Sequence, residues 1–542
     1  MKESPSSRES AALVHLVIEL IAYSPTVDFP TVPEPNDGAR NLGARASAAR
    51  KRRDVDVSAL GDARAHARME FLVDWSRARG VRWSDETLEV KNVSTSGGAG
   101  DDRGVTHRGI FATRAIAGDR EEDLVVIPRR AMIACGGDGG EADTGRRDEG
   151  ARRGGDAEEA QDELAIELLR RRSAGTRDEF AEYINSMPTE YNLLQSWSEE
   201  EIDALQDAQA KALALRRREQ IRRAYARNKD RLVDLLGEGG ASFSDYEWAR
   251  ATVSSRAVSV PFHAAGALCP MGDMFNYAPP DAPELIEVVG APMHGTRDCL
   301  DDCLETRVAS RLNEDARPVP GYGVYDDVAK TFAFKTARQP EGRRGVREDE
   351  EIYVCYGEYS NLQLLDFYGF TLAPDENPQD SYTLDVNGSP LQVFVGGFSW
   401  TDLANLRVLI AIQCASTTKA KINEKAIRDI ARRGGALGAE AELRTFSAVR
   451  DAAAETLLSF PTTAQSDVEA LNAPTTSLSE NMRLAITWRL CAKRIVQRAY
   501  RWADARCAEA DAEVAATAVS TISLAHVRRP KSSLKGGTHG GS

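Results

Sequence analysis

The stretch "ALCPMGDMFNY", residues 267 to 277, places turn residues and polar side chains among apolar ones. Gly272, Asp273 and Asn276 are surrounded by Leu, Met, Phe and Tyr, so the chain turns in hydrophobic surroundings. Turns usually run over the solvated surface, because unpaired backbone groups are costly to bury. The pattern therefore indicates that a ligand or another strand completes these hydrogen bonds. An Asx-type turn without a ligand is the alternative interpretation.

Two further side chains are suited to a polar site. Arg256, in "SSRAVSVP", carries a guanidinium group that can form paired hydrogen bonds with a carboxylate. A solvent-exposed surface arginine is the alternative. Tyr356, in "EEIYVCYG", continues an alternation of Ile352 and Val354 that is typical of a strand. Its hydroxyl either serves a site or belongs to a core tyrosine of that strand.

Composition limits the class of protein. The chain has 542 residues, which is more than one core normally serves, so we expect two or three domains. The formal net charge of −14 argues against direct, nonspecific binding to nucleic acid or to anionic lipid. No apolar run approaches the roughly 20 residues that a membrane-spanning helix needs, so we expect no membrane association.

The cysteines do not predict a metal site. Of eight cysteines, Cys299 and Cys303 form the one close pair, and C-x3-C without a second pair or a nearby histidine is a weak zinc signal. Free thiols in a reducing compartment are the expected state. The chloroplast, the cytoplasm and the nucleus all fit, and the sequence does not choose among them.

The elements that must position these residues alternate between β-rich and helical stretches. Residues near 81–133 and 257–372 show short β-type runs, and the block between them, 161–256, has helical spacing. After residue 383 amphipathic helices predominate. These patterns predict an α+β fold with a separate all-α C-terminal domain. The predicted boundaries are an N-terminal extension (1–65, partly disordered), a β-rich domain (66–382) with a disordered insertion (136–160) and a helical insertion (161–256), a helical domain (383–515) and a disordered tail (516–542).

The motifs, in this order, resemble the SET-domain methyltransferases, in the branch typified by the Rubisco large-subunit methyltransferase. "HRGIFATRAIAGD" is similar to the first SET strand pair, and "WARATVSSRAVSVP" to the helix and strand that close the inserted helical block. "GALCPMGDMFNYAPP" resembles the Asp-hydrophobic-x-Asn-His core motif, in a variant most like a plant-type subgroup. "EEIYVCYGEYSNLQLLDFYGF" resembles the family's Tyr-Gly…Tyr-Gly-Phe segment. "LLSFPTTAQSDVEAL" and "ITWRLCAKRIV" look like the helical substrate-binding domain, and the resemblance covers about residues 66 to 510.

The resemblance implies an S-adenosylmethionine-dependent protein methyltransferase that acts on lysine and needs no metal. Tyr356 takes the place of the catalytic tyrosine, and Arg256 that of the arginine that binds the cofactor's carboxylate. The backbone of 273–277 and the Asn276 amide are expected to complete the cofactor's hydrogen bonds. The implied cofactor-binding residues are Thr106, His107 and Arg108 in a contact loop, Arg256, Asp273, Met274, Phe275, Asn276 and Tyr277, and Tyr368, Gly369 and Phe370 along the channel.

Two departures from the family pattern leave alternatives open. The family's usual Asn-His is Asn276-Tyr277 here, and its usual first glycine falls on His107. These two residues favour a SET-fold scaffold that binds proteins without catalysis, while histidine methylation is an alternative within the same class. The expected partner is a protein substrate docked on the C-terminal helical domain of a monomer. Asp467 and Arg489 in that domain either face the substrate or form an internal ion pair.

Overall fold

The computed structural model describes residues 71–95, 105–135, 154–237, 239–281, 317–417, 423–433, 435–473 and 478–527. The predicted extension 1–65, residues 136–153 of the predicted disordered insertion, and the Cys299/Cys303 pair lie outside the described residues. The chain divides into two compact units. The first comprises described parts of residues 1–282, 305–380 and 461–491, and the second those of 381–460 and 492–542.

The first unit contains a four-stranded antiparallel sheet. Its strand order is β1 (Arg82–Trp83), β4 (Asp123–Pro128), β9 (Thr331–Lys335) and β8 (Tyr322–Asp326). The apolar run of β4 supplies the core, and Val125 and Ile127 are fully buried. The sheet joins the two β-rich stretches that the sequence separates by the helical block, because β4 precedes that block and β9 follows it.

Three two-stranded pairs complete the β structure of the described first unit. They are β2 (Leu88–Thr95) with β3 (Val105–Ala112), β5 (Ala257–Val260) with β6 (His263–Leu268), and β7 (Asn276–Tyr277) with β10 (Tyr353–Val354). The first two pairs are antiparallel, whereas β7 and β10 are parallel. The parallel pair aligns two segments that lie far apart in the sequence.

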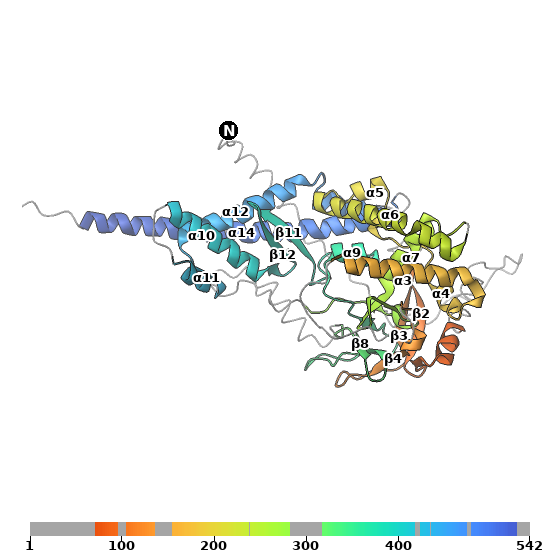
Figure 1. The fold of residues 1–542 in the computed structure, drawn as a ribbon. Coiled ribbons are helices and arrows are strands. Elements are labelled where there is room, and N and C mark those ends of the chain that lie inside the picture. Colours follow the sequence, from red (N-terminus) through yellow and green to blue (C-terminus); the bar gives the residue numbers. More distant parts are fainter. Residues whose placement is uncertain are drawn as a thin grey trace, which may run out of the picture. The chain divides into compact units, whose positions relative to one another are not determined.

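Up to residue 380, the described helices of the first unit lie mostly in the predicted helical insertion, with one helix before it and one after it. They are a helix over 71–78, α3 (Gly154–Ala174), α4 (Ala181–Ser186), α5 (Glu199–Asp203), α6 (Ala208–Leu236), α7 (Phe243–Arg256) and α9 (Asn361–Tyr368). Short 3-10 turns occur at η1 (Arg129–Ala131), η2 (Gly175–Arg177), η3 (Leu194–Ser196) and η4 (Gly272–Met274). Figure 1 shows α3 and α7 side by side, with β2, β3 and β4 below them in the view. Both helices contribute buried residues to one core with these strands.

Several helix starts follow the capping chemistry of the sequence. Ser198 and Ser360 each accept a hydrogen bond from the third residue of the helix they begin, and the side chain of that residue bonds back. The helix that Ser198 begins is short and ends at Asp203. Gln206 then has a positive φ of 57°, and Asp207 caps a separate helix, α6.

Two predicted boundaries of disorder are wrong in part. α3 begins at Gly154, inside the stretch expected to be disordered up to residue 160. Ala157, Glu158 and Glu159 have high helix propensity, which favours a helix that starts earlier than the Gly-rich, charged composition indicated. At the other end, α14 (Glu480–Val527) passes the predicted boundary at residue 516, since no glycine or proline interrupts the chain before Pro530.

The second unit is mostly helical but opens with a small sheet. β11 (Ser381–Val386), β12 (Ser389–Phe394) and β13 (Gly397–Phe398) form an antiparallel sheet. The remaining elements are α10 (Trp400–Thr417), α11 (Glu424–Arg432), α12 (Ala439–Ser459) and the later part of α14. The prediction of an all-helical region missed the hairpin turn at Asn387 and Gly388, whose φ values are 56° and 82°. Asn-Gly is a strong hairpin signal because both residues tolerate positive φ.

Asp467 and Arg489 form an internal ion pair, as one of the two alternatives had it. Asp467 lies on α13 (Ala464–Asn472), and Arg489 Nε donates to its Oδ1 at 2.9 Å. Arg489 also donates to the carbonyl oxygen of Ala204 at 2.6 Å. Both side chains are buried, so neither faces a substrate. Residues 461–491 therefore pack with the first unit, although the sequence patterns assigned them to the helical domain.

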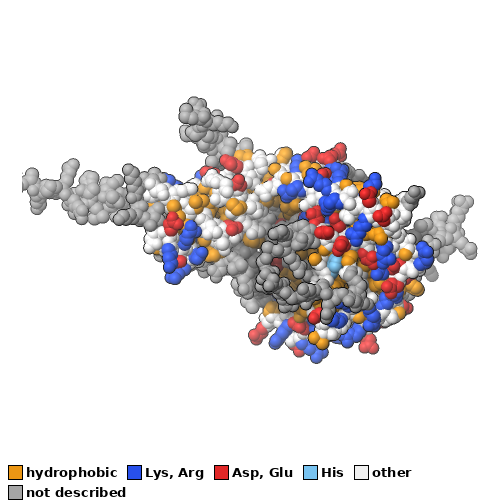
Figure 2. Space-filling view, in the orientation of Figure 1, with side chains coloured by type: hydrophobic (Ala, Val, Ile, Leu, Met, Phe, Trp, Pro, Cys, Tyr) orange, Lys and Arg blue, Asp and Glu red, His pale blue; other side chains and the backbone are white. Residues whose placement is uncertain are grey.

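The surface carries charges of both signs. Figure 2 shows acidic and basic side chains intermixed on the visible face, rather than gathered in a single basic area. In the part of the chain that the structure describes, no helix combines the length and the apolar character needed to cross a bilayer.

Candidate active site

The parallel pairing of β7 with β10 builds the centre of the candidate site. Asn276 is paired with Tyr353 and Tyr277 with Val354, and the amide of Ala278 donates to the carbonyl oxygen of Val354 at 3.2 Å. This register carries Tyr356, two residues after β10, alongside the segment 273–277. The Tyr356 hydroxyl donates to the carbonyl oxygen of Phe275 at 2.5 Å.

Arg256, the last residue of α7, meets the same segment. Its Nη1 atom donates to the carbonyl oxygen of Asp273 at 3.0 Å and to the carboxylate Oδ2 of Asp273 at 2.9 Å. The hydroxyl of Tyr183, on α4, donates to the same Oδ2 at 3.0 Å. Burial lowers the pKa of Arg256, but the neighbouring Asp273 carboxylate outweighs it, so the net pKa is raised and the guanidinium stays charged.

The turn at residues 271 and 272 is held by tight packing. Only glycine fits at position 272, because the ring of Phe334 fills the space that a side chain would need. A Cβ atom there would lie 2.1 Å from the Phe334 Cε2 atom. Met271 before it takes a left-handed backbone with φ of 69°. Non-glycine residues in this region are uncommon, so the surrounding packing must hold the turn in place.

The side-chain amide of Asn276 links three segments. Its Nδ2 atom donates to the carbonyl oxygen of Arg108 at 2.9 Å and to Glu351 Oε1 at 2.6 Å. Arg108 lies on β3, so the first β-rich stretch reaches the same point as β7 and β10. Arg256 and Tyr356 thus both donate to backbone carbonyl oxygens of the segment 273–277, to which Asn276 belongs.

Aromatic rings surround the Tyr356 phenol. The ring centroids of Tyr277 and Tyr368 lie 5.3 Å and 5.0 Å from that of Tyr356. Phe370 lies 6.0 Å from Tyr277 and 6.2 Å from Tyr368. The Tyr277 hydroxyl donates to the carbonyl oxygen of Gly357 at 3.1 Å. Tyr277 therefore packs its ring against this cluster while its hydroxyl is held by the backbone.

The phenols of this cluster stay protonated at neutral pH. Burial raises the pKa of Tyr356, and the nearby positive charge of Arg256 only partly opposes that effect. Burial also raises the pKa values of Tyr277 and Tyr368. The Tyr356 hydroxyl is therefore suited to donating or orienting hydrogen bonds rather than to acting as a strong base.

The remaining predicted residues occupy the following places. Thr106, His107 and Arg108 belong to strand β3, so the segment predicted as a loop is a strand; its backbone pairs with β2. Met274 is buried in η4. Gly369 ends α9 with φ of 76°, and a Cβ atom there would lie 2.9 Å from the backbone of Asn192. Only glycine fits that position without strain.

Two buried polar atoms of the site have no hydrogen-bond partner among the described residues. They are Nε of Arg256 and Oδ1 of Asp273. Buried donors and acceptors are normally satisfied, so these two atoms are where a ligand or a water molecule belongs. A cofactor with both ammonium and carboxylate groups fits this donor and acceptor set. Arg256, however, already faces Asp273, so a cofactor carboxylate must share that guanidinium with it.

Two residues of the site escaped sequence reasoning. Glu351 binds Asn276 through Oε1 and accepts the Tyr353 hydroxyl on Oε2 at 2.6 Å. Its signal was present, since a charged residue alternates with buried Ile352 and Val354 in a β-type run. Tyr183 gave no signal, because an aromatic residue on an apolar helix is indistinguishable from core.

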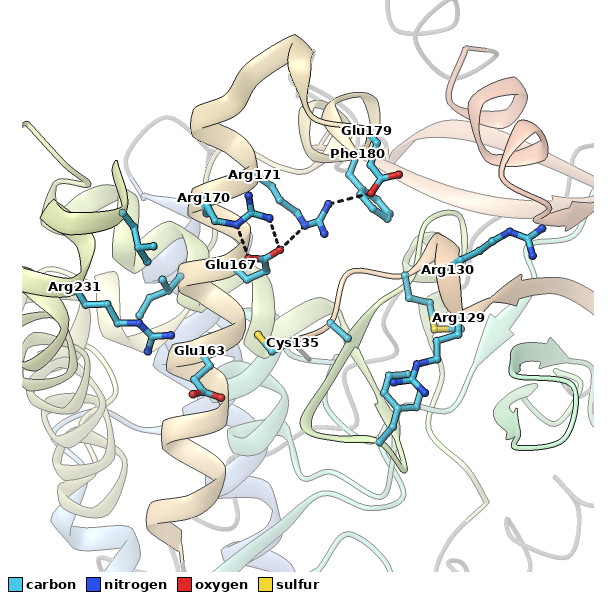
Figure 3. A pocket seen from close by; sticks show the side chains of 15 residues that line it. Arg129, Arg130, Cys135, Glu163, Glu167, Arg170, Arg171, Glu179, Phe180 and Arg231 are labelled. Atoms are coloured by element: carbon cyan, nitrogen blue, oxygen red, sulfur yellow. Dashed lines mark hydrogen bonds and ion pairs between the residues drawn. The ribbon is translucent and has the colours of Figure 1, made fainter. Parts of the chain in front are cut away.

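An open pocket of about 670 Å³ lies elsewhere in the first unit, lined by residues of α3, by the end of α6 and by the segment after β4 (Figure 3). Arg170 and Arg171 converge there on Glu167, whose carboxylate accepts from the Nε atom of each at 2.7 Å. Of the described residues that line this pocket, none belongs to the predicted donor site. Within the described residues, no group of three or more His, Cys, Asp or Glu could hold a metal ion.

Comparisons with known proteins relate parts of the chain to other proteins. Residues 387–496 match the family model described as Rubisco LSMT substrate-binding. The protein named SET DOMAIN GROUP 40 from Arabidopsis thaliana is 29% identical over 227 residues. That alignment covers 42% of this chain and 43% of the relative, so it spans less than half of the curated protein.

Solved structures match over most of the chain. The SET domain of LSMT bound to lysine and AdoHcy gives a TM-score of 0.53 at 19% identity, covering 82% of this chain and 93% of that one. Rubisco LSMT bound to AdoMet gives a TM-score of 0.52 at 19% identity, with the same coverages. These likenesses show the fold, and the expected mixed architecture with its helical C-terminal region is confirmed.

Proposed function

We propose that this chain, which has the SET fold of Rubisco LSMT and a C-terminal Rubisco LSMT substrate-binding domain, is an S-adenosylmethionine-dependent protein methyltransferase acting on lysine. One observation carries the proposal. The parallel pairing of β7 with β10 brings the Tyr356 phenol to the five-residue segment 273–277, which carries the Asn276 amide, and the end of α7 brings the Arg256 guanidinium to the same segment. Structures of this fold that contain AdoMet, or AdoHcy with lysine, support the choice of donor and acceptor.

S-adenosylmethionine, when bound, supplies a methyl group activated on a sulfonium sulfur. The residues that would hold it are those of 273–277, with Arg256 and the β3 segment that includes Arg108. The unpartnered Arg256 Nε and Asp273 Oδ1 atoms supply a donor and an acceptor for its charged amino-acid end. Tyr368 and Phe370 are part of the aromatic cluster around Tyr356, and Gly369 connects them.

Lysine must lose a proton before it can accept a methyl group. With an ordinary pKa near 10.4, deprotonation at pH 7 costs roughly 4 to 5 kcal/mol. Desolvation between Tyr277, Tyr356, Tyr368 and Phe370 lowers that cost, since burial disfavours the ammonium form. The Tyr356 hydroxyl then orients the neutral amine in line with the transferred methyl group, and the proton leaves through water. Because Tyr356 stays a neutral phenol, it contributes orientation rather than proton abstraction.

The protein substrate is proposed to dock on the second unit. The match to the Rubisco LSMT substrate-binding family covers β12, β13, α10, α11 and α12 of this unit, and continues through α13 and the first part of α14, most of which belong to the first unit. The identity of that substrate does not follow from the match, and neither does the number of methyl groups added.

Methyl transfer and donor binding can be tested separately on the full chain. Calorimetry with S-adenosylmethionine should give measurable heat, and tandem mass spectrometry of treated protein extracts should locate the new methyl group on lysine. Methylated histidine would instead support the alternative specificity. No binding heat would support the catalytically inactive scaffold and overturn the proposal.

The substitution Tyr356→Phe tests the assigned phenol. We expect kcat to fall at least about 100-fold, because the hydroxyl that orients the amine is lost, while donor affinity changes little. Tyr225→Phe is the matched control, since that hydroxyl donates to the carbonyl oxygen of Ala241 at 3.1 Å, away from the candidate site. Equal turnover by the Tyr356→Phe protein and the wild type would refute the role of Tyr356.

A further inference from the structure

We propose that Glu351 is a positioning residue that sets the orientation of the Asn276 amide for the cofactor's ammonium group. The inference rests on the proposed function, because it assigns Asn276 to the cofactor pocket. Neither the sequence motifs nor the matches to known proteins assign a role to Glu351. Its carboxylate joins the segment of β10 to Asn276 on β7, and each of its contacts can be tested.

The contacts of Glu351 are short and use both carboxylate oxygens. Oε1 accepts from Asn276 Nδ2 at 2.6 Å, and Oε2 accepts from the Tyr353 hydroxyl at 2.6 Å. Hydrogen bonds to an ionised acceptor are shorter and about twice as strong as neutral ones. A carboxylate held from both sides in this way has little freedom to move away from Asn276.

The backbone places Glu351 before its side chain makes any contact. An isolated antiparallel bridge joins Glu351 to Phe111, and the amide of Ile352 donates to the carbonyl oxygen of Ile110 at 2.7 Å. Residue 351 therefore lies against β3, while Tyr353 pairs with Asn276 in the parallel register. Both strands around the Glu351 carboxylate are fixed by backbone hydrogen bonds.

Gly109 leaves the space that the carboxylate occupies. A Cβ atom on Gly109 would lie 2.2 Å from Glu351 Oε1 and 3.2 Å from Asn276 Nδ2. The absence of a side chain at 109 is thus required by the Glu351–Asn276 pair. Any larger residue at this position must push the carboxylate away from the amide.

The two hydrogen bonds of Asn276 determine which end of its amide is available. Nδ2 donates to the carbonyl oxygen of Arg108 at 2.9 Å and to Glu351 Oε1, so both of its N–H groups are used. An amide group has two donors on nitrogen and an acceptor oxygen. The remaining oxygen, Oδ1, is therefore presented as an acceptor, which suits an ammonium group and repels a carboxylate.

Glu351→Gln removes the charge and keeps the shape of the side chain. We expect the dissociation constant and the KM for S-adenosylmethionine to rise roughly 10-fold, because a charge-assisted hydrogen bond becomes a neutral one. The value of kcat should change less than about threefold, since Glu351 does not touch the reacting atoms. Glu350→Gln is the matched control, because the Glu350 carboxylate binds Arg344 at 2.6 Å and 2.7 Å instead of Asn276.

A rescue experiment separates positioning from a merely structural role. Asn276→Asp places a second carboxylate against Glu351 and removes both donors, so affinity for S-adenosylmethionine should fall roughly 100-fold. In the Asn276→Asp/Glu351→Gln double variant, the glutamine amide can donate to the new aspartate. Affinity should then recover to within roughly 10-fold of the wild type, whereas independent effects would multiply.

The outcomes distinguish this inference from the function on which it rests. If the wild type binds and transfers methyl groups, but Glu351→Gln has wild-type affinity or the double variant shows multiplied losses, the positioning role is wrong and the proposed function stands. If the wild type gives no binding heat, both fall together. Thermal unfolding of every variant checks that a change in affinity is not a loss of folded protein.

Discussion

At the scale of single residues, the candidate site depends on buried phenols with assigned hydrogen bonds. Tyr183 donates to Asp273, Tyr356 to the Phe275 carbonyl oxygen and Tyr277 to the Gly357 carbonyl oxygen. The Tyr277 ring also packs in the aromatic cluster, 5.3 Å from the Tyr356 ring and 6.0 Å from the Phe370 ring. Burial raises the pKa of each of these three tyrosines.

These raised pKa values predict a loss of stability in alkali. In the unfolded chain a tyrosine loses its proton near pH 10, while the folded protein keeps it bound. The contribution is fully present below pH of about 10 and is lost as the pH rises toward the raised folded pKa. The free energy of unfolding should thus fall by about 1.4 kcal/mol per pH unit above 10 for each such tyrosine.

Tyr183→Phe isolates one of these contributions, because that ring is fully buried. Urea unfolding at pH 9 and at pH 11 should show a smaller loss of stability in the variant than in the wild type, by about 1.4 kcal/mol. The same pH dependence in both proteins would contradict the assignment of a raised pKa to Tyr183.

At the scale of elements, α9 connects stability with the site. The helix begins at Ser360, whose side chain accepts from the amide of Gln363 at 3.3 Å, and it ends with Tyr368 and the left-handed Gly369. Arg217, on α6, holds the middle of α9 by donating from Nε to both carboxylate oxygens of Asp366 at 3.0 Å. The position of Tyr368 in the aromatic cluster therefore depends on how well this helix is capped and anchored.

Two matched serine substitutions test this dependence. Ser360→Ala and Ser198→Ala each remove a capping box, so each should lower the free energy of unfolding by about 1 kcal/mol in denaturant titrations. In the methyl-transfer assay we expect a lower kcat for Ser360→Ala alone, since α5 carries none of the residues proposed for the site. Equal activities of the two variants would mean that α9 positions Tyr368 without its cap.

At the scale of the whole molecule, the chain returns to its first unit after most of the second. Residues 461–491 belong to the first unit, where the buried Arg489–Asp467 pair and the Arg489 contact with the Ala204 carbonyl oxygen join α13 and α14 to the segment before α6. Thr462 adds a hydrogen bond to Gln206 Oε1 at 2.7 Å. The first unit is therefore complete only when residues beyond 460 are present.

Removing one partner of the buried pair should be severe. Asp467→Ala leaves the Arg489 guanidinium buried without its carboxylate, and we expect a loss of about 3–5 kcal/mol in the free energy of unfolding. Glu219→Ala is the control, because its pair with Arg223 on α6 is exposed and should contribute less than about 0.5 kcal/mol. Similar small losses in both variants would show that the pair does not stabilise the first unit.

Local patterns in the sequence were enough to predict much of the fold. The β-type run before Tyr356, the helical spacing of residues 161–256 and the split of β-rich material around that block all rest on short-range chemistry, such as periodicity. The same kind of signal, Asn387-Gly388, indicated a hairpin that the prediction overlooked. The ordered motifs also predicted that Asn276, Arg256 and Tyr356 belong to one site, and in the structure Arg256 and Tyr356 bond to the segment that contains Asn276.

Contacts between distant segments were decided by the tertiary structure alone. Arg256 could be expected to bind a carboxylate, but that Asp273 supplies one follows from α7 meeting η4, and the register of β7 on β10 brings Glu351 to Asn276. Asp467 and Arg489 likewise became a buried pair within the first unit. The physical reason is that periodicity and capping act over a few residues, whereas the partner of a buried charge or amide is set by packing between segments that sequence spacing does not relate.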